Sequence, residues 1–282
     1  QASPQYPARF QGFEQNPDTA ALLFALAIPI ATYLILATRS LLVRIVLGAT
    51  LLLFVGSLAG SGSRGPMLAA LAGALVVVLS AASGRNRVVL AVIAFVAFVG
   101  CVGISRIPQA KPAPPTTPGG APAIRRTLFS SSGRRAAWGG AIHQAENRPV
   151  AGYGFGTESR VFVDRYASFE SDLVENTYIG TALQLGVVGL ALLCAVVGAA
   201  VGVFARAPSA GIETGCAGVT AAALVVAATQ SYLLSVGNIG TATAWVSLFL
   251  LAGLRAVPAA QSAVAASSER MPSRETASSH SE

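Results

Sequence analysis

Charged residues are scarce in this chain of 282 residues: they make up 11% of it, against about 25% in a typical soluble domain. Hydrophobic residues make up 53%, and the mean hydropathy is +0.62. The shortage of charge excludes a soluble globular domain. The high hydrophobicity excludes disorder over most of the length, because disordered chains combine low hydrophobicity with high charge. The composition therefore predicts a polytopic membrane protein.

Lysine is almost absent, so the basic excess consists of arginine. The chain has 18 Arg and the single Lys111 against 12 acidic residues, a net charge of +7. A strongly basic balance can indicate nucleic-acid binding. Here the arginines lie in the connections between apolar runs, where membrane-topology signals are found. We therefore expect a lipid bilayer and no nucleic acid as partner.

Cysteine is also scarce, with three residues in the chain. Cys101, Cys194 and Cys216 all lie inside apolar runs and show no C-x-x-C spacing. This pattern excludes a disulfide framework and a zinc site. It favours small buried apolar side chains.

Long apolar runs are abundant, and a bilayer-spanning helix needs about 20 mostly apolar residues. The interiors of these runs lack ionisable residues, and no alternation at period two suggests a membrane barrel. The sequence thus predicts an all-α transmembrane bundle with four spans in 19–105 and three in 177–257. The expected spans are 19–37, 43–60, 66–83, 88–105, 177–204, 215–235 and 238–256. The run 177–204 is long enough to tilt or to begin as a surface helix.

The arginines between the runs predict the orientation. Cytoplasmic connections are enriched in Lys and Arg, which places the long segment 106–176 and the start 1–18 outside the cytoplasmic membrane. The tail 258–282 is then a disordered cytoplasmic end. An external start without a signal peptide suggests that earlier spans precede this sequence. The arginines that define the cytoplasmic side are Arg39, Arg44, Arg85, Arg87, Arg206 and Arg255.

The external segment 106–176 holds most of the polar residues. Its first part, 107–122, contains six prolines and is expected to be an extended linker. The stretch 134–147 is expected to form a helix with Trp138, Ile142 and Ala145 on one face, ended by Asn147-Arg148-Pro149.

A glycine segment follows this helix, with the sequence Gly-Tyr-Gly-Phe-Gly over 152–156. Alternate glycines favour a tight turn with exposed backbone N–H groups, which can receive an anion. It is not a dinucleotide-binding fingerprint, because no strand–helix unit surrounds it. The candidate binding residues in this segment are Gly152, Gly154 and Gly156.

Two further sets of residues in or beside the external segment have alternative interpretations. Arg64, Arg134 and Arg135 could bind a lipid diphosphate through the planar guanidinium fork, or could be solvated loop charge. Glu175 and Asn176 lie where the polar segment enters the apolar run at 177. Glu175 is either a helix-start carboxylate favoured by the helix dipole or a general base at the membrane boundary.

Several motifs, taken in order, resemble those of the O-antigen ligase/polymerase family. Glu175-Asn176 is followed after nine residues by Gly-Val-Val-Gly at 186–189. This resembles the family motif, in which His and a residue with a small polar amide side chain are followed, after nine residues, by Gly-x-x-Gly. The family pattern has a Gly-Arg, a Trp and a Pro-x-x-Gly-x-Gly-x-Gly segment upstream, and here these are Gly133-Arg134, Trp138 and 149–156. The resemblance covers most of 9–256 and includes Ser63-Arg64-Gly65 and the segment Arg9–Gly12 followed by Asn16-Pro17.

The resemblance implies a membrane glycosyltransferase that moves a polyprenyl-diphosphate-linked glycan to an acceptor hydroxyl of a glycan or glycolipid, without a metal or other cofactor. Glu175 would be the base, Asn176 would orient it or the sugar, and the arginines would hold the diphosphate. Glu175 stands where ligases typically carry His, which weakens the interpretation as a lipid-A ligase and suits the polymerase or exopolysaccharide branch. Asp172 is the nearest alternative base.

A polysaccharide transporter or lipid flippase is the main alternative from another class. Such proteins usually carry ionisable residues or broken helices at mid-membrane. The seven runs lack ionisable interiors, which favours chemistry at the interface.

Overall fold

The computed structural model describes residue 10 and residues 17–81, 134–158, 161, 174–206, 211–235 and 238–253. These parts are helical and contain no strand, which confirms the all-α expectation. The predicted span 88–105, the proline-rich linker, nearly all of 1–16 and the tail lie outside the described residues. The helices are α1 (Pro17–Ala37), α2 (Leu41–Ser61), α3 (Arg64–Ala81), α5 (Arg134–Ala145), α7 (Thr177–Arg206), α8 (Ile212–Ala227) and a C-terminal helix (Ile239–Gly253).

The ends of the first helices follow from local sequence. Pro17 begins α1 and Asp18 lies in its first turn, where proline is tolerated and a carboxylate favours the helix dipole. Helix α2 ends at Gly62, which has φ 67° and so adopts the left-handed cap conformation that glycine tolerates. Helix α3 begins two residues later, so a tight turn joins α2 to α3, and the two helices diverge from it to pack mainly on other helices.

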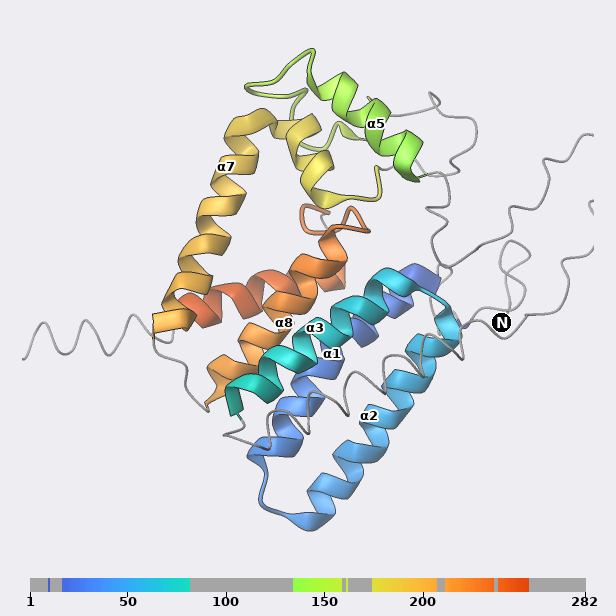
Figure 1. Cartoon of the computed structure of the whole chain (residues 1–282), viewed down its shortest axis with the longest axis vertical. Helices are drawn as coiled ribbons and strands as arrows, with labels where there is room; N and C mark the ends of the chain where they lie inside the picture. Colours follow the sequence, from blue (N-terminus) through green and yellow to red (C-terminus); the bar gives the residue numbers. More distant parts are fainter. Residues whose placement is uncertain are drawn as a thin grey trace, which may run out of the picture.

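The core of the bundle is formed by α1, α3 and α8, which lie together in Figure 1. Small residues let these helices approach closely. A Cβ at Gly73 of α3 would lie 2.5 Å from the Gly218 carbonyl of α8 and 2.5 Å from Pro29 of α1. A Cβ at Gly218 would lie 2.5 Å from Val77. Glycine is therefore required at this three-helix contact.

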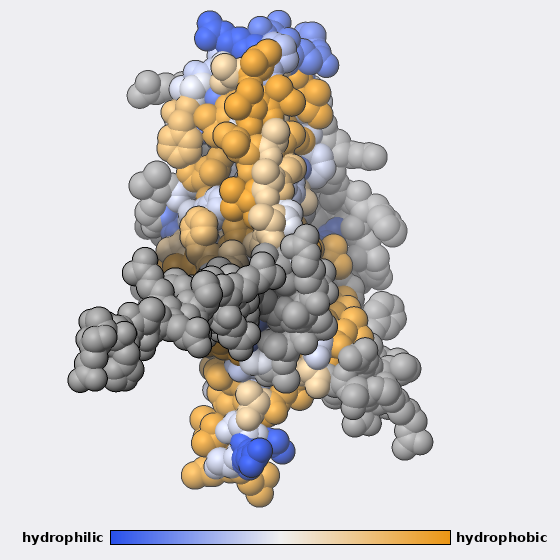
Figure 2. Space-filling view, turned by 90° about the vertical axis from the view of Figure 1, so that its left-hand side faces the viewer, coloured by the Kyte–Doolittle hydropathy of each residue, from blue (hydrophilic) through white to orange (hydrophobic). Residues whose placement is uncertain are grey.

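The outer surface is apolar along the bundle and hydrophilic at its ends. Leu41 and Leu52 of α2 are 72% and 75% exposed, as expected of a helix that faces lipid. Figure 2 shows an apolar face between two hydrophilic ends, which correspond to the region before α7 and the turn between α1 and α2 in Figure 1. The described part thus has the surface of a membrane protein.

Four helices are long and apolar enough to cross a membrane: α1, α2, α3 and α7. Helix α8 is shorter than the run predicted for it, and the C-terminal helix is described as far as Gly253. Helix α8 ends at Ala227, well before the predicted end of its run at 235, because Gln230 and Ser231 bond to other elements instead of continuing the helix.

Candidate active site at the polar end of the bundle

One end of the bundle gathers the start of α1, the turn between α2 and α3, the start of α7 and the segment after α8. The Ser63 hydroxyl donates to the Asp18 carboxylate. The Gln230 amide donates to the Asp18 carbonyl at 3.1 Å. We call this region the polar end. The turn between α1 and α2, with Arg39, lies at the opposite end of the bundle (Figure 1).

Arg64 lies at the polar end as the first residue of α3, and its side chain is half-buried. The next residue, Gly65, packs directly on the turn after α8: a Cβ there would lie 2.1 Å from the Thr229 hydroxyl. This contact fixes the start of α3 beside the segment that also holds the start of α7. Arg64 therefore shares the polar end with Glu175 and Asn176, although 111 residues separate Arg64 from Glu175 in sequence.

Glu175 has an unusual backbone conformation, with φ 55°, the only positive φ among the described non-glycine residues. A non-glycine residue in this region costs roughly 1–3 kcal/mol and persists where the surroundings hold it there. Its side chain is half-buried immediately before α7. Such local strain is a frequent feature of functional sites.

Asn176 caps the start of α7. Its side-chain oxygen accepts hydrogen bonds from the Tyr178 and Ile179 amides at 3.0 and 3.1 Å, the usual N-cap arrangement. Its side-chain nitrogen donates to the Ala228 carbonyl at 3.0 Å. Both ends of the amide are thus engaged within the protein, and Asn176 fixes the backbone directly after Glu175.

Sequence reasoning missed Glu158, which is 7% exposed. One carboxylate oxygen accepts hydrogen bonds from the Val174 amide and the Ser231 hydroxyl, and the other accepts one from the Gln184 side chain. Burial raises the pKa of this carboxyl above its ordinary value of 4.5, and the three hydrogen bonds act in the opposite direction. The sequence offered little signal for Glu158, one of several acidic residues in the external segment.

The glycine segment does not present free amides as expected. The Gly152 amide donates to the Arg148 carbonyl at 3.0 Å and the Gly154 amide to the Gln184 carbonyl at 2.8 Å. The Gly156 amide donates to the Gln184 side-chain oxygen at 2.8 Å. All three glycines have positive φ. Because their N–H groups are occupied by protein acceptors, the expected anion-receiving turn is corrected to a loop that clamps α7.

Helix α7 is broken at Gly186, where φ is 64° and ψ is −163°, and the two arms meet in a sharp bend in Figure 1. The break removes the helical bonds from Val187 to Leu183 and from Val188 to Gln184. The loop satisfies all four groups. The carbonyls of Leu183 and Gln184 accept hydrogen bonds from the amides of Tyr153 and Gly154, respectively. The amides of Val187 and Val188 donate to the carbonyls of Pro149 and Val150, respectively.

Two glycines make this pairing possible. A Cβ at Gly152 would lie 2.4–2.6 Å from the backbone of Gln184 and Leu185. A Cβ at Gly186 would lie 2.2 Å from the Val150 carbonyl oxygen. The Pro-x-x-Gly-x-Gly-x-Gly and Gly-x-x-Gly motifs are therefore the two sides of one backbone contact.

Helix α5 packs on the first arm of α7. The Trp138 indole donates to the Val174 carbonyl at 3.0 Å, directly before Glu175. Ala141 is fully buried in this contact, whereas Ile142 is 48% exposed. The expected face Trp138–Ile142–Ala145 is therefore wrong at its middle member. Arg134 and Arg135 begin α5, but their side chains, like Asp172, lie outside the described residues.

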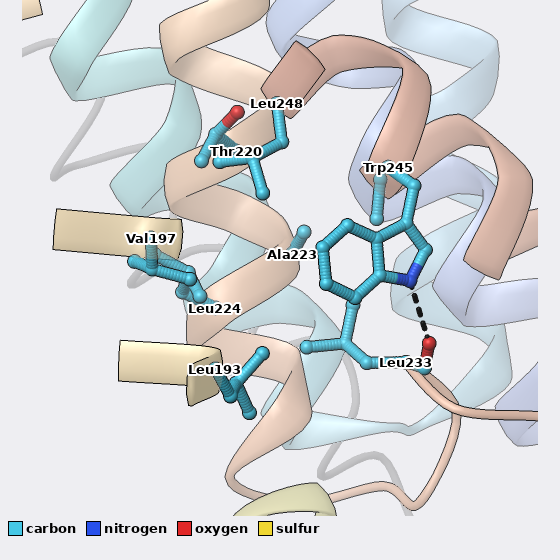
Figure 3. Close-up of a pocket in the computed structure, with 9 residues that line it drawn as sticks. Leu193, Val197, Thr220, Ala223, Leu224, Leu233, Trp245 and Leu248 are labelled. Carbon is cyan, nitrogen blue, oxygen red and sulfur yellow. Dashed lines mark hydrogen bonds between the residues drawn. The ribbon is translucent and has the colours of Figure 1, made fainter. Parts of the chain in front are cut away.

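An apolar crevice lies between the second arm of α7, α8 and the C-terminal helix (Figure 3). Leu193, Leu224 and Trp245 line it, and the Trp245 indole donates to the Leu233 carbonyl at 2.8 Å. Leu233 is two residues from Ser231 of the polar end. The crevice is therefore an apolar feature of the bundle interior, lined by residues of three helices.

In the part of the chain that the structure describes, no group of three His, Cys, Asp or Glu side chains is arranged to hold a metal ion.

No curated protein and no solved structure matches the chain. A family model described as O-antigen ligase matches residues 49–194, which are 146 of the 282 residues. This stretch contains Arg64, the glycine segment, Glu158 and the break in α7. Because the match covers more than half of the chain, the chain belongs to the O-antigen ligase family.

Proposed function

We propose that the chain transfers a polyprenyl-diphosphate-linked glycan to an acceptor hydroxyl at the external face of the cytoplasmic membrane, as a ligase or polymerase of cell-surface polysaccharide. Membership of the O-antigen ligase family assigns it to polysaccharide assembly. The observation that carries the finer proposal is the half-buried Glu175, held with positive φ at the polar end that Arg64 shares. A carboxylate next to a lipid-facing bundle suits a reaction between membrane-anchored substrates.

Glu175 is the base in this proposal. The acceptor oxygen forms a bond to the anomeric carbon of the donor glycan while the bond from that carbon to the diphosphate breaks. The acceptor proton passes to the Glu175 carboxylate, and polyprenyl diphosphate leaves with the bonding electron pair. Asn176 supports the base by capping α7.

The leaving diphosphate needs positive charge, and the proposal assigns this to Arg64, Arg134 and Arg135. Guanidinium groups bind phosphate oxygens through two parallel hydrogen bonds, so they can stabilise the leaving group without a metal. The glycine segment has a supporting role: it holds the loop after α5 against the broken α7.

The test is the Glu175→Gln substitution in the full-length protein, assayed with lipid-diphosphate-linked oligosaccharide. The amide keeps the size of the side chain and cannot take the proton, so the rate should fall roughly 10²–10⁴-fold. Glu175→His should retain more activity than Glu175→Gln, because imidazole is also a base. Glu146→Gln, at an exposed glutamate after α5, is the matched control and should transfer normally. A near wild-type rate in Glu175→Gln would show that another residue is the base, and Asp172 would be the next candidate.

A transporter or flippase is the second candidate, and the broken α7 favours it, since discontinuous helices form ion sites in transporters. In α7, however, the four backbone groups freed by the break are bonded to the loop rather than open to an ion. The same assay separates the two. Glycan elongation with release of polyprenyl diphosphate supports transfer, whereas movement of intact lipid-linked glycan across vesicles without release supports transport.

A further inference from the structure

Both backbone neighbours of Glu175 are tied to a single oxygen of Glu158. The Val174 amide donates directly to Glu158 Oε1 at 2.8 Å. The Asn176 amide donates to the Ser231 hydroxyl at 3.1 Å, and this hydroxyl donates to the same Oε1 at 2.8 Å. The residue with positive φ therefore lies between two anchors that converge on one buried carboxylate.

We propose that Glu158 is the positioning residue of the site: its carboxylate holds the strained backbone of Glu175, and so the direction of the catalytic side chain. This inference rests on the proposed function of Glu175. These two anchors hold the amides on both sides of Glu175, so their loss would favour relaxation of its backbone to negative φ, which an L-residue prefers. The side chain would then leave the polar end in a different direction.

A carboxylate suits this position because it accepts three hydrogen bonds and donates none. Gln184 supplies the third donor, to Glu158 Oε2 at 2.9 Å, and its own side-chain oxygen accepts the Gly156 amide at 2.8 Å. An amide at position 158 would place its NH2 group against the NH2 group of Gln184. If the Gln184 amide turned over, its NH2 group would instead face the Gly156 N–H, so two donors would still oppose each other.

The Glu158 carboxylate packs closely against α7. Gly180 of α7 faces Glu158, and a Cβ there would lie 2.7 Å from Oε2. Burying a carboxylate costs free energy, as the raised pKa of Glu158 reflects. A residue needed only to fill space would not require that cost, whereas an anchor for two amide groups requires an acceptor.

The experiment compares Glu158→Gln with the double substitution Glu158→Gln/Gln184→Glu in the full-length protein reconstituted in nanodiscs. The double variant exchanges carboxylate and amide. The amide oxygen at 158 can then accept from Val174 and Ser231, its NH2 group can donate to the new carboxylate at 184, and that carboxylate can accept from Gly156. Glu158→Gln should lower kcat about 10- to 100-fold, as expected for a misplaced catalytic group, with KM for the lipid-linked donor nearly unchanged. The double variant should recover most of kcat.

Gly180→Ala provides a second route to the same defect, because it displaces the carboxylate without changing charge. Gly198→Ala is its matched control on the same helix, since a Cβ there meets nothing within 4 Å. Gly180→Ala should lower kcat as Glu158→Gln does, and Gly198→Ala should leave it unchanged. Wild-type kcat in both Glu158→Gln and Gly180→Ala would overturn the proposal.

Hydrogen–deuterium exchange over residues 174–177 provides a readout that does not depend on turnover. Exchange should accelerate in Glu158→Gln and return to the wild-type rate in the double variant. If the double variant recovers protection but not kcat, Glu158 acts through its charge and the positioning role is wrong. If the variants show these exchange effects but the wild-type protein transfers no glycan from the lipid-linked donor, the proposed function fails while the anchoring of Glu175 stands.

Discussion

Single residues at the polar end have conformations or surroundings that their residue types do not favour. Glu175 has positive φ, and Glu158 is a carboxylate with 7% exposure. Neither feature improves stability by itself, because a strained backbone and a buried charge both cost free energy. Their combination in one hydrogen-bonded network is typical of a functional site rather than a packing region.

A prediction at this scale concerns Arg64 at the start of α3. Arg64→Lys keeps the charge but loses the planar fork, so it should still impair glycan transfer. Loss of one charge-assisted contact should cost about 1.5–3 kcal/mol, or roughly ten- to a hundredfold in kcat/KM. Arg39→Lys, exposed at the opposite end of the bundle, is the matched control. Equal kcat/KM for Arg64→Lys and Arg39→Lys would show that Arg64 does not bind the donor diphosphate.

A second prediction follows from the raised pKa of Glu158. Because the folded protein binds this proton more tightly than the unfolded chain, Glu158 contributes most to stability below its ordinary pKa of 4.5. This proton-linked part of the contribution is lost as pH rises through the folded-state pKa, whereas the hydrogen bonds to the ionised carboxylate remain. The difference in Tm between wild type and Glu158→Gln should therefore shrink from about pH 4 towards pH 7, as measured by thermal unfolding. A difference that grows over this range would mean that the hydrogen bonds outweigh burial.

At the scale of elements, α7 and the loop after α5 form one structural unit. The loop residues 149–154 bond to the four backbone groups that the break in α7 leaves open. Helix α5 holds the same unit through the Trp138 indole and the Val174 carbonyl. The break is therefore stabilised by a segment that lies far from it in sequence, and it directs the first arm of α7 towards the polar end.

The prediction for this unit is that Gly186→Ala destabilises it. The φ of 64° and ψ of −163° fall in a region open essentially to glycine, which costs another residue about 1–3 kcal/mol. The new Cβ would also meet the Val150 carbonyl oxygen. Thermal unfolding should show a lower Tm, and hydrogen–deuterium exchange should accelerate at residues 149–154.

Gly198→Ala in the second arm of α7 is the control for this experiment. Its Cβ would point into open space, and alanine favours a helix by about 1 kcal/mol over glycine. Its Tm should equal or exceed that of the wild type. A Tm for Gly186→Ala equal to that of Gly198→Ala would show that α7 tolerates a continuous helix.

At the scale of the whole molecule, an apolar surface lies between the polar end and the opposite, hydrophilic end of the bundle. The polar end holds Arg64, Glu158 and Glu175, and the turn between α1 and α2 holds Arg39 and Arg44 at the other end (Figure 1). The arginine distribution predicts that the second end is cytoplasmic. The proposed donor is used outside the membrane, so the mechanism depends on this orientation.

Cysteine labelling of intact cells measures the orientation. In a background with the native cysteines replaced by Ala, His143→Cys should react with an impermeant thiol reagent, because His143 is 84% exposed on α5, which packs against α7. Ser40→Cys, exposed between α1 and α2, should react only after permeabilisation. Labelling of Ser40→Cys alone in intact cells would invert the topology and exclude an external reaction.

The sequence by itself determined the helical bundle and the family. Within lipid a chain has to satisfy its backbone groups internally, so apolar runs of the right length become helices. The positions of α1, α2 and α3, and the start of α7 after Glu175-Asn176, therefore followed from local composition. The order of the motifs indicated the O-antigen ligase family, because it reflects ancestry and needs no coordinates.

The tertiary structure alone decided how the motifs meet. The break at Gly186, the clamp from the glycine segment, the early end of α8 and the burial of Glu158 all depend on hydrogen bonds between distant segments. Hydropathy and helix periodicity describe a residue by its near neighbours, so they cannot identify the partner of a backbone amide that lies far away along the chain. For the same reason the three glycines were expected to bind an anion, while in the folded chain the Gly154 and Gly156 amides bond to Gln184 of α7 and the Gly152 amide bonds to the Arg148 carbonyl.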